Sequence, residues 1–130
     1  MKISLFILLL MIFLHIVDDY YLQGILANMK QKSWWEKNAP DPLYKNDYCI
    51  ALLEHAFSWT FMIMLPIAVC MLIGYNIPAI YYFAFFIFNF FCHAFIDNEK
   101  ANKKTINLII DQTAHLIQIA LTWSVCFIGV

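Results

Sequence analysis

The sequence predicts an all-α fold: a polytopic membrane four-helix bundle with up-down topology, formed as a single domain over residues 1–130. Two observations predict it. Hydrophobic residues make up 63% of the chain and charged residues 13%, and the mean hydropathy is +0.69, outside the range of soluble globular proteins. Four apolar segments, each close to the roughly 20 residues that cross a bilayer, are separated by shorter polar stretches.

The first span is expected over residues 3–22 and opens with the run ISLFILLLMIFL. A signal peptide is the alternative, but no small-residue cleavage site follows, and His15 and two aspartates come directly next. We therefore expect a retained helix that extends as an amphipathic segment to Lys30. The polar segment 30–47 holds two prolines, which predict irregular structure or turns, and two tryptophans, which suit the membrane–water interface. It would serve as an interfacial anchor or as a lid over a site.

The remaining spans are expected over residues 48–73, 78–97 and 106–128. Pro66 lies inside the second span and should kink the helix or free a backbone carbonyl. A short turn through Gly74 follows, and Pro78 suits the first turn of the third helix.

Topology is predicted from the lysines. Seven of the eight lie in the connections after the first and third spans, whereas Lys2 alone lies before the first span. The positive-inside rule then places both connections in the cytoplasm and both termini on the non-cytoplasmic side. We expect a multi-pass protein of the cell inner (cytoplasmic) membrane.

Each span carries a histidine within or beside its apolar run, and three of these histidines have an aspartate four residues away. The groups are His15 with Asp19, His93 with Asp97, Asp111 with His115, and the adjacent Glu54 and His55. Residues four apart share one face of a helix. Because the groups end spans 1 and 3 and begin spans 2 and 4, all four should lie at one depth, near the cytoplasmic leaflet.

Imidazoles and carboxylates on facing helices can hold a divalent metal ion, so the sequence predicts a metal site. Zn, Mn or Fe would suit these ligands, in one open site or in two sites. The widely spaced cysteines, without a CxxC motif, argue against a thiolate site. The candidate ligands are His15, His55, His93, His115, Asp19, Asp97 and Asp111, and the three aspartates are also candidate catalytic bases.

A purely structural role is the competing interpretation. Polar side chains join membrane helices with about 0.6 kcal/mol per pair, whereas a charge at a helix centre costs about 2.5 to 3.5 kcal/mol. Asn, Ser or Gln would join the helices at lower cost. The abundance of ionisable groups therefore favours a functional site.

The segments HIVDDYYLQ, EHA, HAFIDNEKA and DQTAHL carry a family resemblance. They resemble the pattern H-x3-D-[FY]-x-[LY]-Q, H, H-x-[LIF]-[IL]-D-x-x-K-A and D-Q-x-x-H of a bacterial and phage family of small multi-span membrane proteins. That family is classed as a domain of unknown function. The resemblance touches all four spans, and it adds Gln23, Lys100 and Gln112 as candidates for substrate contact. A looser similarity, in motif style alone, is to membrane-bound metal-dependent hydrolases.

The leading functional hypothesis is metal-dependent hydrolysis of a lipid-linked or membrane-proximal small-molecule substrate, in which a metal-activated water attacks. Proton or metal transport is one alternative, for which a homo-oligomer would supply the path. A non-catalytic membrane factor is another. The lipid bilayer is the expected partner, and the net charge of −1 gives no reason to expect nucleic acid.

Overall fold

The computed structural model describes residues 3–127, and within that range it contains helices and turns but no β-strand. The prediction of an all-α fold is confirmed. The α-helices are α1 (Ile3–Val17), α2 (Leu26–Met29), α3 (Lys32–Asn38), α4 (Asp47–Leu72), α5 (Ala79–Asn98) and α6 (Leu108–Phe127). A π-helical turn extends α1 (η1, Asp18–Leu22), another extends α5 (η3, Glu99–Lys103), and a 3₁₀ turn (η2, Pro42–Tyr44) precedes α4.

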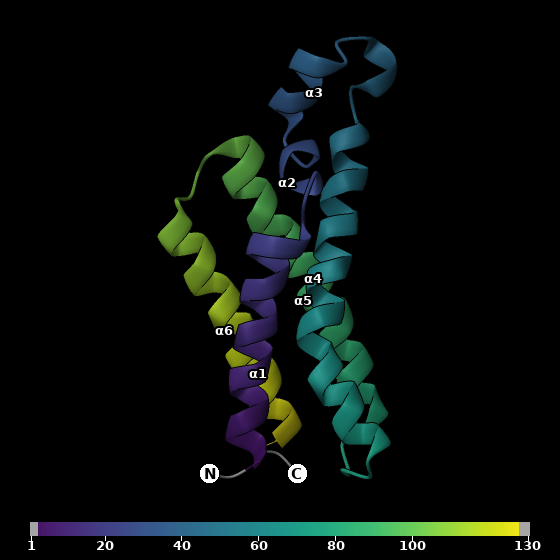
Figure 1. Cartoon of the computed structure of the whole chain (residues 1–130), viewed down its shortest axis with the longest axis vertical. Helices are drawn as coiled ribbons and strands as arrows, with labels where there is room; N and C mark the ends of the chain where they lie inside the picture. Colours follow the sequence, from purple (N-terminus) through teal and green to yellow (C-terminus); the bar gives the residue numbers. More distant parts are fainter. Residues whose placement is uncertain (1–2, 128–130) are drawn as a thin grey trace.

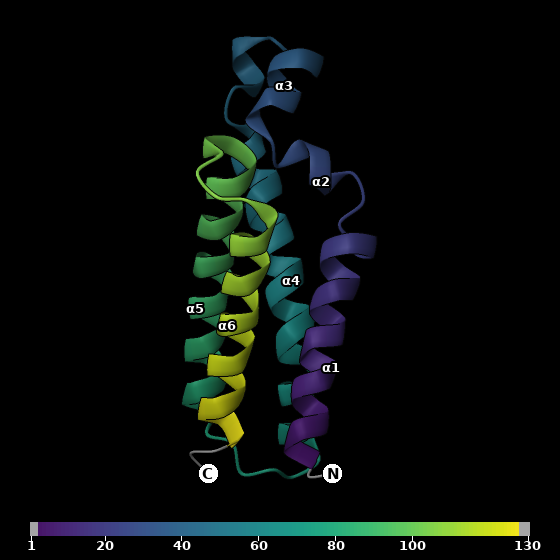
Figure 2. The same ribbon diagram turned by 90° about the vertical axis from the view of Figure 1, so that its left-hand side faces the viewer.

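The four long helices lie side by side in an up-down bundle (Figures 1 and 2). Helix α1 packs against α4 and α6, and α5 packs against the same two helices. The start of α1, the end of α6 and the α4–α5 turn lie at one end of the bundle. Helices α2 and α3 and the α5–α6 connection lie at the other, so both lysine-bearing connections occupy the same end, called the polar end below.

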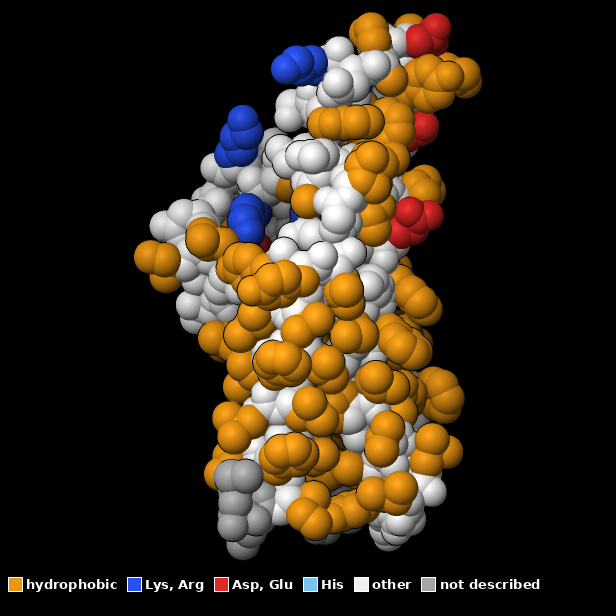
Figure 3. All heavy atoms as spheres, in the orientation of Figure 1, with side chains coloured by type: hydrophobic (Ala, Val, Ile, Leu, Met, Phe, Trp, Pro, Cys, Tyr) orange, Lys and Arg blue, Asp and Glu red, His pale blue; other side chains and the backbone are white. Residues whose placement is uncertain are grey.

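Three helical stretches are long and apolar enough to cross a membrane: Ile3–Leu22, Pro42–Leu72 and Ala79–Lys103. Large apolar side chains such as Phe13, Phe57, Phe91 and Ile117 are exposed along the bundle. Figure 3 shows apolar side chains covering the lower part of one face, with the visible charged side chains in its upper half. Helix α6 is not among the three stretches, and Lys2 and Ile128 lie outside the described residues.

Two details of the sequence prediction are corrected. The segment 30–47, expected to hold irregular structure or turns, contains the helix α3. The 3₁₀ turn η2 in the same segment begins at Pro42 because the Asp41 carboxylate accepts from the Leu43 backbone N–H at 2.8 Å. The first helix does not continue to Lys30, because Gly24 adopts a positive φ of 49° and turns the chain before α2. Helix α4 runs through Pro66 without a break in its helical assignment.

The apolar core fills the bundle below the polar end. Trp59, Ile63 and Ile67 of α4 are fully buried, together with Met11 of α1 and Ile119 of α6. Toward the polar end this core gives way to a layer of buried ionisable side chains contributed by all four long helices or their extensions.

Candidate metal centre

Six ionisable side chains converge where the four long helices meet below the polar end, and we call them the His/Asp cluster. Its members are Asp19 of η1, His55 of α4, His93 and Asp97 of α5, and Asp111 and His115 of α6. All six are buried, with at most 7% of any residue exposed. The structure thus brings together most of the predicted ligands from four separate segments. Glu54, next to His55, is exposed and takes no part.

His55 lies at the centre of one half of the cluster. Its Nε2 atom lies 3.4 Å from Oδ1 of Asp19, 3.2 Å from Oδ2 of Asp97 and 3.2 Å from Nε2 of His93. A zinc ion with ligands at about 2.0 to 2.2 Å in tetrahedral geometry spaces those ligands about 3.3 to 3.6 Å apart. The three distances from His55 are close to that spacing. Asp19, His55 and His93 form one triad that could hold a metal ion.

His115 lies at the centre of the other half. Its Nε2 atom lies 3.4 Å from Oδ1 of Asp97 and 3.5 Å from Oδ1 of Asp111. His93, Asp97 and His115 form a second possible metal triad, so His93 and Asp97 connect the two halves. The two oxygens of Asp97 face different imidazoles, Oδ2 toward His55 and Oδ1 toward His115.

Gln118 determines which nitrogen of His115 is protonated. Its amide nitrogen lies 3.3 Å from the backbone oxygen of Asn89, and its amide oxygen faces Nδ1 of His115 at 3.1 Å. An amide oxygen can only accept, so Nδ1 carries a proton, and when the ring is neutral Nε2 presents a lone pair. Within residues 3–127 that Nε2 has no hydrogen-bond partner, and neither has Oδ1 of Asp111. Buried acceptors that face one another require a cation or a proton between them.

The charges of the cluster lead to the same requirement. Four carboxylates are buried here, because Asp18 lies beside the cluster, fully inaccessible. Two ammonium groups compensate part of their charge: Lys30 Nζ lies 2.5 Å from Asp97 Oδ2, and Lys100 Nζ lies 2.6 Å from Asp111 Oδ2. With neutral imidazoles, two negative charges remain. One divalent cation supplies that charge, whereas two would leave the site positive unless anions accompanied them.

His15 does not join either triad, and its role as a ligand stays a prediction. The indole Nε1 of Trp59 donates to His15 Nδ1 at 2.7 Å, so the proton of the neutral ring lies on Nε2. That Nε2 faces the amide oxygen of Gln112 at 3.1 Å. The Gln112 amide nitrogen in turn donates to Asp19 at 3.1 Å and to Asp111 at 3.0 Å. His15 therefore orients an amide that holds two carboxylates of the cluster.

Asp18 stands behind His55. Its Oδ1 accepts from the Ser58 hydroxyl at 2.6 Å, and its Oδ2 lies 3.9 Å from Nδ1 of His55. A carboxylate on the far nitrogen is the usual way in which a protein orients a metal-binding histidine. Both Asp18 and Asp19 face inward because they belong to η1, a π-helical turn of the kind frequently found at functional sites.

The remaining predicted residues lie between the cluster and the polar end. Lys100 pairs with Asp111, and Gln112 contacts two carboxylates as described. Gln23 donates to the backbone carbonyl of Asp19 and lines two cavities above the cluster.

A family model described as "Protein of unknown function (DUF3307)" matches residues 5–129. The chain belongs to this family. No curated protein and no solved structure matches the chain.

Two residues of the site in this DUF3307 protein were not singled out from the sequence. Trp59 is fully buried and stacks on His93 with ring centroids 4.2 Å apart. Its position one helical turn after His55 is a signal that could have found it. The sequence indicated only a topological role for Lys30. In the structure Lys30 donates to Asp97, and the Asn102 amide holds the lysine in place by donating to its backbone oxygen at 3.1 Å. That contact joins distant segments and leaves no local signal.

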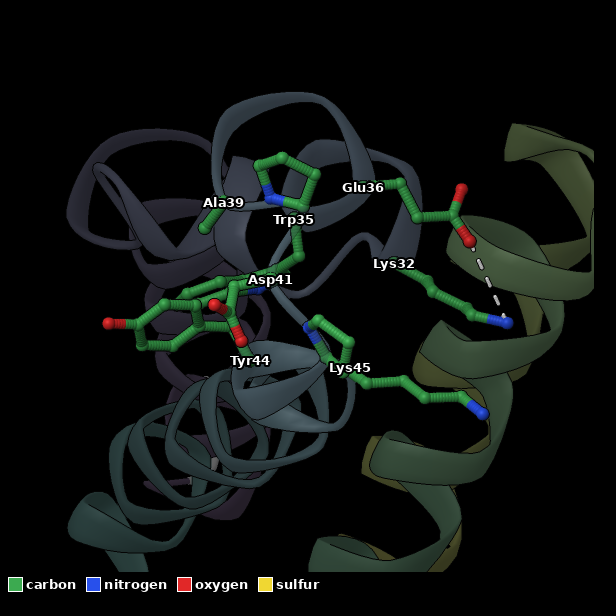
Figure 4. A pocket seen from close by; sticks show the side chains of 9 residues that line it. Lys32, Trp35, Glu36, Ala39, Asp41, Tyr44 and Lys45 are labelled. Carbon is green, nitrogen blue, oxygen red and sulfur yellow. Dashed lines mark ion pairs between the residues drawn. The ribbon is translucent and has the colours of Figure 1, made fainter.

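A separate cavity of about 330 Å³ lies between α3 and η2, outside the cluster. Trp35 and Tyr44 stack along it with centroids 6.4 Å apart, and Figure 4 shows the side chains of Lys32 and Lys45 extending to one side, Lys32 toward Glu36. No member of the His/Asp cluster lines this cavity. Its aromatic and lysine side chains suit the interfacial anchor better than a catalytic pocket.

Proposed function

We propose that this chain is an integral membrane protein with one divalent metal ion in the His/Asp cluster, and that it hydrolyses a membrane-proximal substrate. In this proposal α6 is the fourth span, the polar end faces the cytoplasm, and both termini lie outside. The lysines of that end support this orientation through the positive-inside rule. The inner membrane is the expected location.

One observation carries the metal proposal: Nε2 of His115, the nitrogen that Gln118 leaves free in the neutral ring, faces two carboxylate oxygens at 3.4 and 3.5 Å. Imidazole and carboxylate ligands suit Zn, Mn or Fe. The candidate nitrogen ligands are His55, His93 and His115, and the candidate oxygen ligands are Asp19, Asp97 and Asp111. A catalytic ion would take only part of this set, because one position must stay open for water. A bound ion of this kind supplies a nucleophilic water at neutral pH and polarises the bond to be cleaved.

Access to the cluster favours hydrolysis over a structural role. A cavity of about 100 Å³ is lined by Asp19, Asp97 and Gln112, so a water molecule entering from the polar end reaches two carboxylates. Asp19 is the better candidate for the general base, because Oδ2 is held by Gln112 while Lys30 already occupies Asp97.

Transport is the weaker candidate. A pathway across the bilayer needs polar groups along the bundle, and those described extend only through Gln118, Asn89 and Thr122. Beyond them the interior is filled by fully buried apolar residues such as Met64, Ile67 and Cys126.

Elemental analysis of the full chain, purified in detergent without affinity tags that bind metal, tests the proposal. We expect one divalent ion per chain, lost in a His55→Asn/His93→Asn/His115→Asn variant that retains the helical circular dichroism of the wild type. Hydrolysis of added membrane lipid extract should require the ion and return when it is restored. A folded protein that stays free of metal after dialysis against Zn, Mn and Fe salts would reject the proposal.

A further inference from the structure

The proposed hydrolysis does not by itself identify a class of substrate. The cavity above the cluster indicates which class fits. This cavity, about 510 Å³ in volume, lies between α2 and η3 at the polar end. It shares Gln23, Lys30, Asp97 and Lys100 with the smaller cavity that reaches Asp19, so the two form one path from the surface to the cluster. Its volume lies within the range of small-molecule sites.

The walls of this path are rich in hydrogen-bond donors. Lys30, Lys100 and Lys104 line the larger cavity together with the amides of Gln23 and Gln31, against the carboxylate of Asp97, and the smaller cavity adds the carboxylate of Asp19. Figure 3 shows lysine side chains gathered on this side of the polar end. Lys30 and Lys100 already offset the charges of Asp97 and Asp111, so the positive charge that the wall adds is that of Lys104 at the outer rim.

The lysine ammonium groups retain N–H donors that make no hydrogen bond to the described chain. Each carries three N–H groups, and within the described chain Lys30 and Lys100 each make one side-chain hydrogen bond, to Asp97 and to Asp111. The Lys30 side chain is only 14% exposed, so its remaining donors are held within the protein rather than spread into solvent. A multi-oxygen anion such as phosphate accepts several of them, whereas a carboxylate offers only two oxygens.

The surroundings of the path point to a substrate on a lipid chain. Tyr20 and Leu108, both about half exposed, line the smaller cavity, and Ile106 lines the larger one. Ile25 and Ile109, which flank these segments, are exposed by 64% and 75%. An amphiphile could thus keep its chain beside these apolar side chains while its headgroup enters the cavity.

From these observations we propose that the cavity binds the phosphate group of a lipid headgroup and presents it to the His/Asp cluster. This inference rests on the proposed hydrolytic function, and it names the class of substrate: a phosphate ester or diphosphate carried by a lipid. Lys100 and Lys104 bind the phosphate oxygens, and Lys30 holds Asp97 while donating to the same anion.

The test measures binding of a fluorescent short-chain phosphatidic acid to the full chain in detergent, with inorganic phosphate as competitor and diacylglycerol of the same chain length as neutral control. We expect phosphatidic acid to bind and diacylglycerol not to bind. Lys100→Gln should weaken binding about tenfold and Lys104→Gln about threefold, because the second lysine is more exposed. Lys37→Gln, the same charge change on exposed α3 outside the cavity, should have no effect.

Should Lys100→Gln fail to fold, Lys104→Glu reverses a charge at the exposed rim and should abolish most of the binding. Displacement by inorganic phosphate at a comparable concentration would assign the site to free phosphate, which supports the anion chemistry but overturns the lipid source. Equal binding of diacylglycerol, or equal losses in Lys37→Gln and Lys104→Gln, would overturn the proposal. Metal content is measured on the same samples: metal-loaded protein that ignores phosphatidic acid refutes this inference alone, whereas metal-free protein refutes the proposed function.

Discussion

The two histidines His15 and His55 offer the sharpest test of the cluster, because they face the same site and have opposite expected roles. Nε2 of His55 lies within 3.4 Å of three other candidate ligand atoms. Both nitrogens of His15 are instead engaged with protein side chains, Trp59 and Gln112. We therefore expect His55→Gln to remove a ligand and His15→Gln to leave the ligand set complete.

The expected magnitudes follow from these positions. Loss of a residue that only orients a ligand weakens metal binding about 10- to 100-fold, so we take about 100-fold as the least effect of losing a ligand itself. When the free metal is about 100 times the wild-type dissociation constant, binding stabilises the fold by about 2.7 kcal/mol. A 100-fold weaker variant retains about 0.4 kcal/mol of that at the same metal concentration. His55→Gln should thus lose about 2.3 kcal/mol of metal-dependent stability.

Chelator competition gives the dissociation constants, and unfolding with and without metal gives the linked stabilities. His15→Gln should lower the stability of the metal-free protein, because the Trp59 donor loses its buried acceptor, while keeping the metal stoichiometry of the wild type. Loss of the ion in His15→Gln together with its retention in His55→Gln would refute the roles assigned to the two histidines. Equal metal affinities in both variants would also refute the distinction between the two histidines.

Two further predictions concern single contacts, and a third concerns the membrane topology. Gln118→Leu removes the acceptor on Nδ1 of His115, so metal affinity should fall about 10- to 100-fold in chelator competition, with the stoichiometry unchanged. Asp97→Asn removes the charge that faces two imidazoles and a lysine, and elemental analysis should find no bound ion at micromolar metal. The topology is tested in a background without native cysteines. A membrane-impermeant thiol reagent should label Asn76→Cys in intact cells, but should label Lys104→Cys only after the cytoplasmic side is exposed. The reverse labelling pattern would show that the proposed topology is inverted.

The helices were largely predictable because their apolar runs have clear limits. The second and third spans, expected over residues 48–73 and 78–97, correspond to α4 at Asp47–Leu72 and α5 at Ala79–Asn98. The i, i+4 spacing also indicated the correct faces: His93 and Asp97 are both buried, as are Asp111 and His115. Periodicity is a local property of a helix, and it survives folding.

The roles within the cluster were less predictable, because they depend on which side chain another helix supplies. His15 has the same spacing to Asp19 as His93 has to Asp97, yet Trp59 of α4 occupies its Nδ1. Lys30 reaches Asp97 only because the chain turns at Gly24, where φ is positive. Neither contact can be recognised from the sequence of one segment. Spacing alone therefore grouped His15 with the predicted ligands and indicated only a topological role for Lys30.

The two π-helical turns explain how one helix end can present neighbouring polar residues to the same interior. Adjacent residues of an α-helix diverge by about 100°, so Asp18 and Asp19 would not both face inward from a regular helix. Within η1 both are buried, with Asp18 on Ser58 and Asp19 close to His55. Such turns are rare and are found mostly at functional sites. Both η1 and η3 extend a long helix at the level of the cluster, where their irregular hydrogen bonding places acids and lysines together. A bundle that needed only helix packing would not require this irregularity.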